Sequence, residues 1–414
     1  MSSEPVVIVG AGLAGLACAI ELHKRQIPFL LLEASHAPGG RVRTDRLDGF
    51  QLDRGFQVYL TAYPEGERLL NYKDLQFGRF SPGAMVYLNG SFHRVMDPWR
   101  EPFAALSGIL NPVGSMKDKL LVARLRAVSM AGKPEDLLRK PEKPSHQALQ
   151  DYGFSQNMID RFFRPFFGGI MLDAELNVSS RMLEYVFRMM AAGDTTLPAQ
   201  GMGAIPAQLA AQLPANSIRY GARVEAVSDR VVRLQGNEEI SATAVVVATD
   251  GPAPAKLLPE LAPIESRMAM TLYFSIQGAA PITDPIILLN GDMEWPIQNA
   301  CIPSLVCPSY APPGHHLASV VVLGDPGQSD AAIESAVRTQ LTRWLKQDLS
   351  GWRLLRTYRI RNAHPAYRPE TVAEKPTRLK SGVYICGDHR FMPSIQAALV
   401  NGRHAAEAVA EHAG

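Results

Sequence analysis

The sequence predicts an α/β protein in which a Rossmann-like nucleotide-binding domain is interleaved with a second, α+β domain. Three observations predict this architecture: a dinucleotide-binding pattern near the start, two segments of the same strand-and-turn character much further along, and intervening stretches of different composition. The chain of 414 residues is also longer than one compact core usually allows. We therefore expect two domains rather than one.

The dinucleotide-binding pattern lies between Val6 and Glu33. Val6–Val9 is a short run of β-branched apolar residues, which predicts a buried strand. Leu16–Arg25 carries apolar residues at helical spacing, and Phe29–Leu32 predicts a second strand that ends at the acidic Glu33. A strand, a glycine-rich turn, a helix and a strand with an acidic end, within about 30 residues, form the dinucleotide fingerprint.

The glycine-rich turn has the form G-x-G-x-x-G, with Gly10, Gly12 and Gly15. In this motif the first glycine allows a sharp turn, the second lets the backbone approach a pyrophosphate, and the third lets the helix pack closely on the strand. The amino end of the helix then offers free N–H groups to the diphosphate. Glu33 can accept hydrogen bonds from a ribose 2′-hydroxyl and would repel a 2′-phosphate, so the pattern predicts NAD or FAD rather than NADP.

Two further segments have the character of a nucleotide-binding domain. Ser217–Thr249 alternates like a meander of strands and closes on the apolar Val245–Val247, and Gly382–Val409 contains a short strand, an acidic turn and an alanine-rich helix. The stretches between these segments are richer in proline, methionine and aromatic residues. We therefore predict a discontinuous nucleotide-binding domain over 1–75, 200–251 and 376–414, and a discontinuous substrate-binding domain over 76–199 and 252–375.

The composition is that of an ordinary globular protein, with 46% hydrophobic and 20% charged residues. A net charge of +2 gives no electrostatic reason to expect a nucleic-acid partner. The four cysteines are scattered, so we expect no disulfides, no metal site, and loop positions for Cys301 and Cys307. The amino terminus carries no charged leader or cleavable apolar segment, so the expected location is the cytoplasm.

Four further motifs give the chain a resemblance to a known superfamily. They are GGRVRT at Gly39–Thr44, DRGFQVY at Asp53–Tyr59, VVVAT at Val245–Thr249 and GDHRFMPSIQAALVNG at Gly387–Gly402. Together with the interleaved domain order, they resemble the flavoproteins that include flavin amine oxidases, protoporphyrinogen oxidases and phytoene desaturases. The resemblance implies FAD rather than NAD, bound in an extended form with its ring at the boundary between the domains.

The resemblance also implies which residues hold the cofactor. Arg41 is a charge that can offset the diphosphate, and Asp388 suits a hydrogen bond to the ribityl chain. Ser394–Ala398 opens a helix whose dipole would stabilise negative charge on the reduced ring. The implied cofactor-binding residues are Gly10, Gly12, Ala14, Gly15, Glu33, Ala34, Gly40, Arg41, Gly55, Phe56, Gln57, Val224, Thr249, Gly387, Asp388, Ser394, Ile395, Ala397 and Ala398.

The chain departs from the pattern of the amine oxidases in this superfamily. Ala397 stands where glycine is usual at the start of the last helix. The stretch from Leu257 to Trp344 contains no lysine, whereas many amine oxidases carry a lysine that holds a water near the flavin. Arg356–Glu370 (RTYRIRNAHPAYRPE) lacks the tryptophan-led aromatic pair of those enzymes. These departures favour the desaturase, isomerase and porphyrinogen-oxidase branches.

No catalytic triad or metal cluster is evident in the sequence, as expected if the chemistry takes place at a flavin. His389, next to Asp388, is a weak catalytic candidate for proton handling, with a surface position as the alternative. The adjacent His315 and His316 follow a proline-rich turn and are interpreted as solvated residues of a loop.

A phenylalanine-rich stretch, RFFRPFFGGIMLD at Arg161–Asp173, predicts a wall of the substrate cavity, an apolar mouth set against a membrane, or a core-packing segment. Lys117–Val128 is a basic amphipathic stretch, which is typical of a solvated helix and also of a peripheral membrane contact. The predicted pocket residues are Phe162, Phe163, Phe166, Phe167, Tyr59, Tyr273 and Tyr367.

The sequence therefore favours an FAD-dependent oxidoreductase that takes a hydride from a largely apolar small molecule onto the flavin. A flavin amine oxidase that makes an imine and hydrogen peroxide is the alternative within the superfamily. A redox-neutral flavoprotein, such as an isomerase, is compatible with the same residues. A plain NAD-dependent dehydrogenase would leave the carboxy-terminal motif unexplained.

Overall fold

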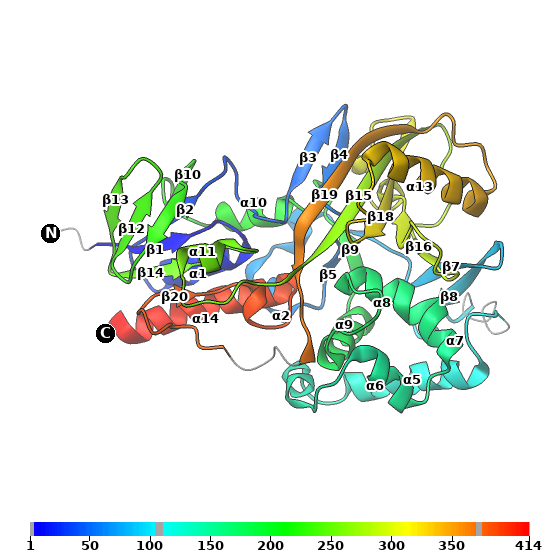
Figure 1. Cartoon of the computed structure of the whole chain (residues 1–414), viewed down its shortest axis with the longest axis horizontal. Helices are drawn as coiled ribbons and strands as arrows, with labels where there is room; N and C mark the ends of the chain where they lie inside the picture. The colour runs from blue at the N-terminus through cyan, green and yellow to red at the C-terminus, as the bar shows by residue number, and fades with distance from the viewer. Residues whose placement is uncertain (1–3, 104–110, 370–374, 414) are drawn as a thin grey trace.

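The computed structural model describes residues 4–103, 111–369 and 375–413, whose arrangement is shown in Figure 1. A five-stranded sheet lies at one end of the molecule, and a seven-stranded sheet with a group of helices lies at the other (Figure 1). Both ends of the chain lie on the side of the five-stranded sheet (Figure 1). The α/β class predicted from the sequence is confirmed.

Five parallel strands form the first sheet, in the order β10 (Ile218–Tyr220), β2 (Phe29–Glu33), β1 (Val6–Val9), β14 (Ala244–Val247) and β20 (Tyr384–Ile385). The central β1 is fully buried, which explains its run of valine and isoleucine, because both faces of a parallel sheet are covered. The strands come from the start, the middle and the end of the chain. The division into two interleaved domains, with the boundaries given above, stays a prediction.

Two layers cover this sheet. The helices α1 (Leu13–Lys24) and α14 (Ile395–Ala413) pack against each other on the face that carries Ile8. Gly402 permits their close approach, because a Cβ there would lie 2.1 Å from the carbonyl oxygen of Ala14. The opposite face, with Val7 and Val9, packs against the antiparallel strands β11 (Val224–Val227), β12 (Val231–Leu234) and β13 (Glu239–Ser241).

The second sheet has seven strands, in the order β19 (Arg353–Pro365), β15 (Ser266–Gln277), β18 (His315–Leu323), β17 (Asn299–Cys301), β16 (Ile287–Asn290), β7 (Gly83–Leu88) and β8 (Ser91–Met96). Its pairings are antiparallel except for that between β7 and β16. The helix α13 (Asp330–Leu345) packs on one face through Ile333, Val337 and Trp344.

A group of helices lies next to this sheet (Figure 1). Its members are α5 (Met116–Met130), η1 (Pro134–Arg139), α6 (Ser145–Tyr152), α7 (Gln156–Met158), η2 (Ile159–Phe163), α8 (Arg164–Met171) and α9 (Ser180–Ala192). The segment η2 is a turn of π-helix that runs directly into α8. Pro165 follows it and has no N–H to donate to the carbonyl of Arg161, which accounts for a break in the ordinary helical bonding here.

The remaining elements are short. They are β3 (Thr44–Leu47), β4 (Phe50–Asp53), β5 (Tyr59–Leu60), α2 (Pro64–Leu69), α3 (Tyr72–Leu75), β6 (Gly78–Arg79), β9 (Thr195–Leu197), α10 (Ala204–Ala210), α11 (Ala253–Leu257), α12 (Pro303–Val306), η3 (Pro308–Tyr310) and η5 (Asp388–Arg390). Within the described residues, no helix has both the length and the apolar character needed to cross a bilayer.

Two expectations about loops are wrong. His315 and His316 begin β18, where they pair with β15, and His316 Nδ1 lies 3.1 Å from Ser304 Oγ. Cys301 lies in β17 and Cys307 directly follows α12, and both side chains are buried. Burial raises the pKa of both thiols, so they are inert structural residues at neutral pH.

A buried carboxylate, Asp53 at the end of β4, joins three parts of the chain. Its Oδ1 accepts hydrogen bonds from Thr44 Oγ1 (2.5 Å) and from the backbone N–H of Met202 (2.9 Å). Its Oδ2 accepts a hydrogen bond from the Tyr310 hydroxyl (2.8 Å). Burial raises the pKa of Asp53 to about 6, although these donors act in the opposite direction. The hairpin of β3 and β4 is thus tied to the segment before α10 and to η3 through one titratable group.

We expect the variant Asp53→Asn to change the pH dependence of stability. Because the pKa of Asp53 in the folded protein, about 6, lies above its ordinary value of 3.8, the folded state binds the proton more tightly than the unfolded chain. The stabilisation is present at acidic pH and is lost as the pH rises through about 6. Asparagine cannot ionise, so the unfolding free energy of the variant minus that of the wild type should increase by about 2 kcal/mol between pH 4 and pH 7.

Urea denaturation at each pH measures this difference, with the exposed Asp48→Asn as the control variant. A difference that stays constant from pH 4 to pH 7 would show that Asp53 does not titrate in this range.

Candidate active site

A cavity of about 1420 Å³ extends from the carboxyl ends of β1 and β2 to the helices η2, α8 and α9. This is larger than the roughly 300–1,000 Å³ of a pocket for one drug-sized ligand. Glycine turns and charged side chains line the end near β1, which we call the nucleotide end. Phenylalanine, methionine and aliphatic side chains line the end near α8, which we call the substrate end.

Nearly all residues predicted to hold the cofactor line this cavity. The exceptions are Gly15 and Ala397, which are buried behind the cavity wall. A Cβ at Gly15 would lie 1.9 Å from the carbonyl oxygen of Gly10, so this glycine serves the packing of α1 on the turn. The predicted residues that do line the cavity are Gly10, Gly12, Ala14, Glu33, Ala34, Gly40, Arg41, Gly55, Phe56, Gln57, Val224, Thr249, Gly387, Asp388, Ser394, Ile395 and Ala398.

Two glycine turns face each other at the nucleotide end. Gly10 has a φ of +104° and Gly40 a φ of +58°, both in the region that favours glycine. A Cβ at Gly40 would lie 3.4 Å from the Cα of Gly12, whereas a Cβ at Gly12 would meet no atom within 4 Å. The slot between the turns is therefore open and lined by backbone, which fits a diphosphate at the start of α1.

Glu33 is held rigidly at the end of β2. Its Oε2 accepts from the backbone N–H of Ala11 (2.9 Å) and its Oε1 from that of Ser35 (2.8 Å). Each carboxylate oxygen keeps further lone-pair capacity for a ribose hydroxyl. Thr249 Oγ1, also in the cavity wall, is buried without a partner among the described residues, so it too can receive a ligand group.

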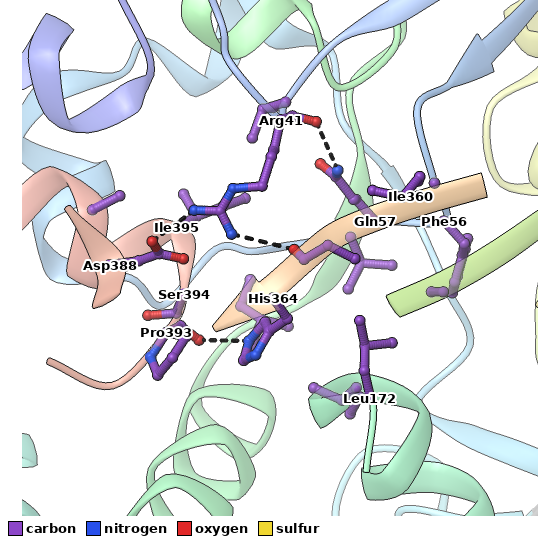
Figure 2. A pocket seen from close by; sticks show the side chains of 18 of the residues that line it. Arg41, Phe56, Gln57, Leu172, Ile360, His364, Asp388, Pro393, Ser394 and Ile395 are labelled. Atoms are coloured by element: carbon purple, nitrogen blue, oxygen red, sulfur yellow. Dashed lines mark hydrogen bonds and ion pairs between the residues drawn. The ribbon is translucent and has the colours of Figure 1, made fainter. Parts of the chain in front are cut away.

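Arg41 lies between two carboxylates from distant parts of the chain, of which Asp388 is labelled in Figure 2. Its Nε is 2.6 Å from Asp250 Oδ2, its Nη2 is 2.6 Å from Asp388 Oδ1, and its Nη1 donates to the carbonyl of Ala363 (3.2 Å). Burial alone would raise the pKa of Asp388, but the Arg41 guanidinium holds it below its ordinary value. The side chain predicted to offset the diphosphate therefore lines the cavity as part of an ion-pair network.

The segment after β4 connects this network to the second sheet. Gln57 Nε2 donates to the carbonyl of Arg41 (3.0 Å), as Figure 2 shows, and the backbone N–H of Phe56 donates to Thr271 Oγ1 on β15 (3.3 Å). A Cβ at Gly55 would lie 2.6 Å from Ile360 Cδ1 on β19, so the chain passes close to that strand here. Residues 55–57 therefore form the part of the cavity wall that lies against β15 and β19.

The helix α14 begins at the cavity wall. Ser394 precedes it, and the Ser394 Oγ accepts a hydrogen bond from the backbone N–H of Ala397 (3.0 Å). Ser394, Ile395 and Ala398 line the cavity, so the positive end of the helix dipole faces it. This is the arrangement expected for the side of a flavin that gains negative charge on reduction.

The structure places His389, the candidate catalytic residue, outside the cavity. Its ring is buried against the backbone of Gly387 and does not line the cavity, and burial lowers its pKa to about 4. His364, at the end of β19, lines the cavity instead (Figure 2). Its Nε2 lies 3.0 Å from the carbonyl oxygen of Pro393 and its Nδ1 lies 3.0 Å from that of Pro365. Burial lowers the pKa of His364 below its ordinary value, although the two carbonyl oxygens act in the opposite direction.

The phenylalanine-rich stretch lines the substrate end, as one of its three interpretations proposed. Phe162, Phe163, Phe166 and Phe167 all belong to the cavity wall, and the rings of Phe162 and Phe166 stack with their centroids 5.4 Å apart. The wider π-helical turn lets consecutive phenylalanines of η2 and α8 contribute to the same wall. Further apolar neighbours are Phe80, Met96, Ile170, Leu172, Met182, Val186, Phe187 and Met190.

The three tyrosines predicted for the pocket do not line it. Tyr59 is fully buried and stacks on Phe77, with ring centroids 5.2 Å apart. The Tyr273 hydroxyl donates to the backbone carbonyl of Asp53 (3.0 Å), beneath the cavity. Tyr367 is buried beside the start of α9. Each side chain points into a core because its strand or loop presents that face to a neighbouring layer.

The described residues contain no group of three or more histidine, cysteine or acidic side chains placed to hold a metal ion.

The model of the flavin-containing amine oxidoreductases matches residues 13–410 of the chain. The chain belongs to this family. As a flavin-containing amine oxidoreductase, the protein is an FAD-dependent oxidoreductase, and FAD is its cofactor. Glu33 would hold its adenosine ribose, the slot at Gly12 its diphosphate, and the amino end of α14 its ring.

The relatives of this chain have names that indicate different substrates. A phytoene dehydrogenase from Streptomyces griseus is 29% identical over 291 residues, which cover 62% of this chain and 56% of that protein. Protoporphyrinogen oxidase 2 from Arabidopsis thaliana is 28% identical over 173 residues, 41% of this chain and 33% of that protein. The chain therefore matches 56% of the length of the first relative and 33% of the length of the second.

A solved structure shows the same fold over the full length. It is a provisionally named protoporphyrinogen oxidase from Exiguobacterium sp. 255-15, which covers 100% of both chains with a TM-score of 0.75 and 19% identity.

We expect Gly12→Val to remove the cofactor without unfolding the protein. The new side chain meets no protein atom within 4 Å at its Cβ and instead fills the slot for the diphosphate. The affinity for FAD should fall by about tenfold or more, since overpacking of a fitted contact costs about 1–3 kcal/mol. The ratio of flavin to protein absorbance measures this loss, and the melting temperature of the flavin-free proteins should be unchanged.

The matched control is Gly351→Val, at another position where a Cβ meets no atom within 4 Å. Full flavin content in Gly12→Val would mean that the diphosphate lies elsewhere.

Proposed function

We propose that this FAD-dependent oxidoreductase oxidises a largely apolar small molecule, as desaturases and porphyrinogen oxidases do. The observation that carries the proposal is the substrate end of the cavity, whose wall is formed by phenylalanine, methionine and aliphatic side chains. Burying apolar surface contributes about 25 cal/mol per Å². An apolar donor would gain binding free energy along the whole of this wall, whereas a small polar one would not.

The protein's own residues position the donor and keep water out. The bound flavin supplies the hydride acceptor. Phe162 and Phe166 present a flat apolar surface, and Leu172, labelled in Figure 2, also lines the cavity. Holding the reacting carbon at one position in a dry cavity replaces a bimolecular encounter by an oriented one.

An amine substrate fits the substrate end less well. An ammonium group is best bound by an unpaired carboxylate or by a cage of aromatic rings. Two carboxylates line this part of the cavity, and both are occupied: Asp45 is paired with Arg54 and accepts from Tyr358, and Asp97 is paired with Arg126. An amine oxidase therefore remains the second candidate rather than the first.

Anaerobic mixing of the oxidised holoenzyme with possible donors tests the proposal. We expect bleaching of the flavin band with a detergent-dispersed polyene or porphyrinogen, and no bleaching with primary, secondary or polyamines. Phe166→Ala should lower kcat/KM for the active donor by about 10- to 100-fold, because a buried phenylalanine contributes about 1.5–3 kcal/mol. Tyr220→Ala, at an exposed aromatic outside the cavity wall, is the control.

Rapid bleaching by an amine would make the protein an amine oxidase. A flavin that is bound but never reduced by any donor would favour a redox-neutral reaction.

We also propose a peripheral membrane contact at the opening of the substrate end. Trp99 and Val122 line the cavity, and the Arg126 guanidinium lies 4.8 Å from the Trp99 ring centroid, so α5 adjoins the opening. Large apolar side chains are exposed in this region: Trp99, Phe103, Met116, Leu120, Val128 and Met130. Lys117 and Arg124 lie on the same helix, and basic residues beside exposed apolar ones favour an anionic lipid surface.

We expect the holoenzyme to sediment with vesicles that contain phosphatidylglycerol and to do so less at high salt. Leu120→Glu should reduce the bound fraction several-fold, because it places a charge in the apolar contact. Trp295→Glu, at an exposed tryptophan outside the cavity lining, should leave binding unchanged. Equal sedimentation of the two variants would argue against this surface.

A further inference from the structure

We infer that Asn299 is a polar recognition point in the substrate end and binds an oxygen atom of the substrate. The inference rests on the proposed function and refines it: the substrate is an apolar molecule that carries a hydroxyl, ether or carbonyl group. Asn299 lies on β17 in the middle of the seven-stranded sheet, lines the cavity and is only 4% exposed.

The amide of Asn299 has no partner among the residues that the structure describes. Its Oδ1 is buried without a hydrogen bond, and its Nδ2 donates to no described residue. Nδ2 is not among the fully buried unpartnered atoms, so it faces the cavity that Asn299 lines. A buried polar group without a partner destabilises the folded protein, and most such groups in proteins are satisfied. An apolar residue of the same shape would be better for stability at this position.

Asn290 shows what a structural asparagine looks like in the same sheet. Its Oδ1 is also buried without a partner, but its Nδ2 donates to the carbonyls of Glu294 and Ile297, and it does not line the cavity. Asn299 makes no such bonds. The difference favours a role for Asn299 toward a ligand rather than toward the fold.

The surroundings of the amide are apolar and leave it open. Ile170, Ile287 and Val321 line the cavity near it on α8, β16 and β18. A Cβ at Gly169 would lie 2.5 Å from Asn299 Nδ2, so any larger residue there would press on the amide. The neighbouring Gln298 donates to the carbonyls of Arg164 and Pro165 and so fixes the start of α8 against β17.

This geometry determines what the amide recognises. An N–H donor in an apolar wall gains a hydrogen bond from an acceptor oxygen of the ligand, and it stays unsatisfied beside a pure hydrocarbon. A site built around such a group discriminates against an analogue that lacks the acceptor more strongly than an apolar wall alone could. The substrate end should therefore prefer an oxygen-bearing polyene to the matched hydrocarbon.

Calorimetric titration of the dithionite-reduced holoenzyme under anaerobic conditions, in which the flavin cannot accept a hydride, tests this preference with farnesene, farnesol and farnesyl methyl ether in detergent. We expect the alcohol and the ether to bind about tenfold more tightly than the hydrocarbon. Asn299→Leu, of similar shape, should bind all three alike. The control Val321→Ala should weaken binding of all three while keeping the preference.

The inference is overturned if the wild type shows no preference, or if Asn299→Leu keeps it. Should Asn299→Leu fail to fold, Gly169→Ala serves as the second variant, because its Cβ displaces the amide; it should also lose the preference. Binding is measured without turnover, so a flavin that these and other apolar donors never reduce would count against the proposed oxidation alone.

Discussion

The guanidinium of Arg41 is the contact on which the cofactor site depends. It binds Asp250, Asp388 and the carbonyl of Ala363, and so holds together four segments that are far apart in the sequence. Removal of one partner from a buried ion pair is strongly destabilising, because the remaining charges lose their compensation. The nucleotide end of the cavity is therefore a property of the complete chain, and no one segment forms it alone.

The two ends of the cavity are lined by different kinds of chemical group. At the nucleotide end, recognition depends on backbone N–H groups, glycine turns and one fixed carboxylate, so few residue types are tolerated there. At the substrate end it depends on the side chains of η2, α8, α9 and β17. This division explains how one fold serves donors as different as polyenes, porphyrinogens and amines: the site decides the function, and the fold only positions it.

The sequence predicts the nucleotide end well because its signals are local. The apolar periodicity, the three glycines and Glu33 all belong to one strand–turn–helix–strand unit. Gly10, Gly12 and Glu33 line the cavity, whereas Gly15 does not. Whether Tyr59 or Tyr273 points to a cavity or to a core depends instead on layers that meet only in the folded chain.

His364 was missed for the same reason, although one signal was present. It stands at the carboxyl end of a long strand and just before Pro365, a place where cavity-lining residues are common in sheets that flank a ligand. The sequence pointed to His389 because it follows Asp388. In the structure its ring packs against Gly387 and does not line the cavity.

The position of β20 has a consequence for how the protein is made. Tyr384–Ile385 completes the five-stranded sheet and α14 then covers α1, yet both are encoded in the last part of the chain. Until they emerge from the ribosome, β14 presents an open strand edge, and open edges are sites of aggregation. Capture of FAD therefore waits until this segment has been synthesised, and a chain that stops before residue 384 lacks both the fifth strand and part of the cofactor site.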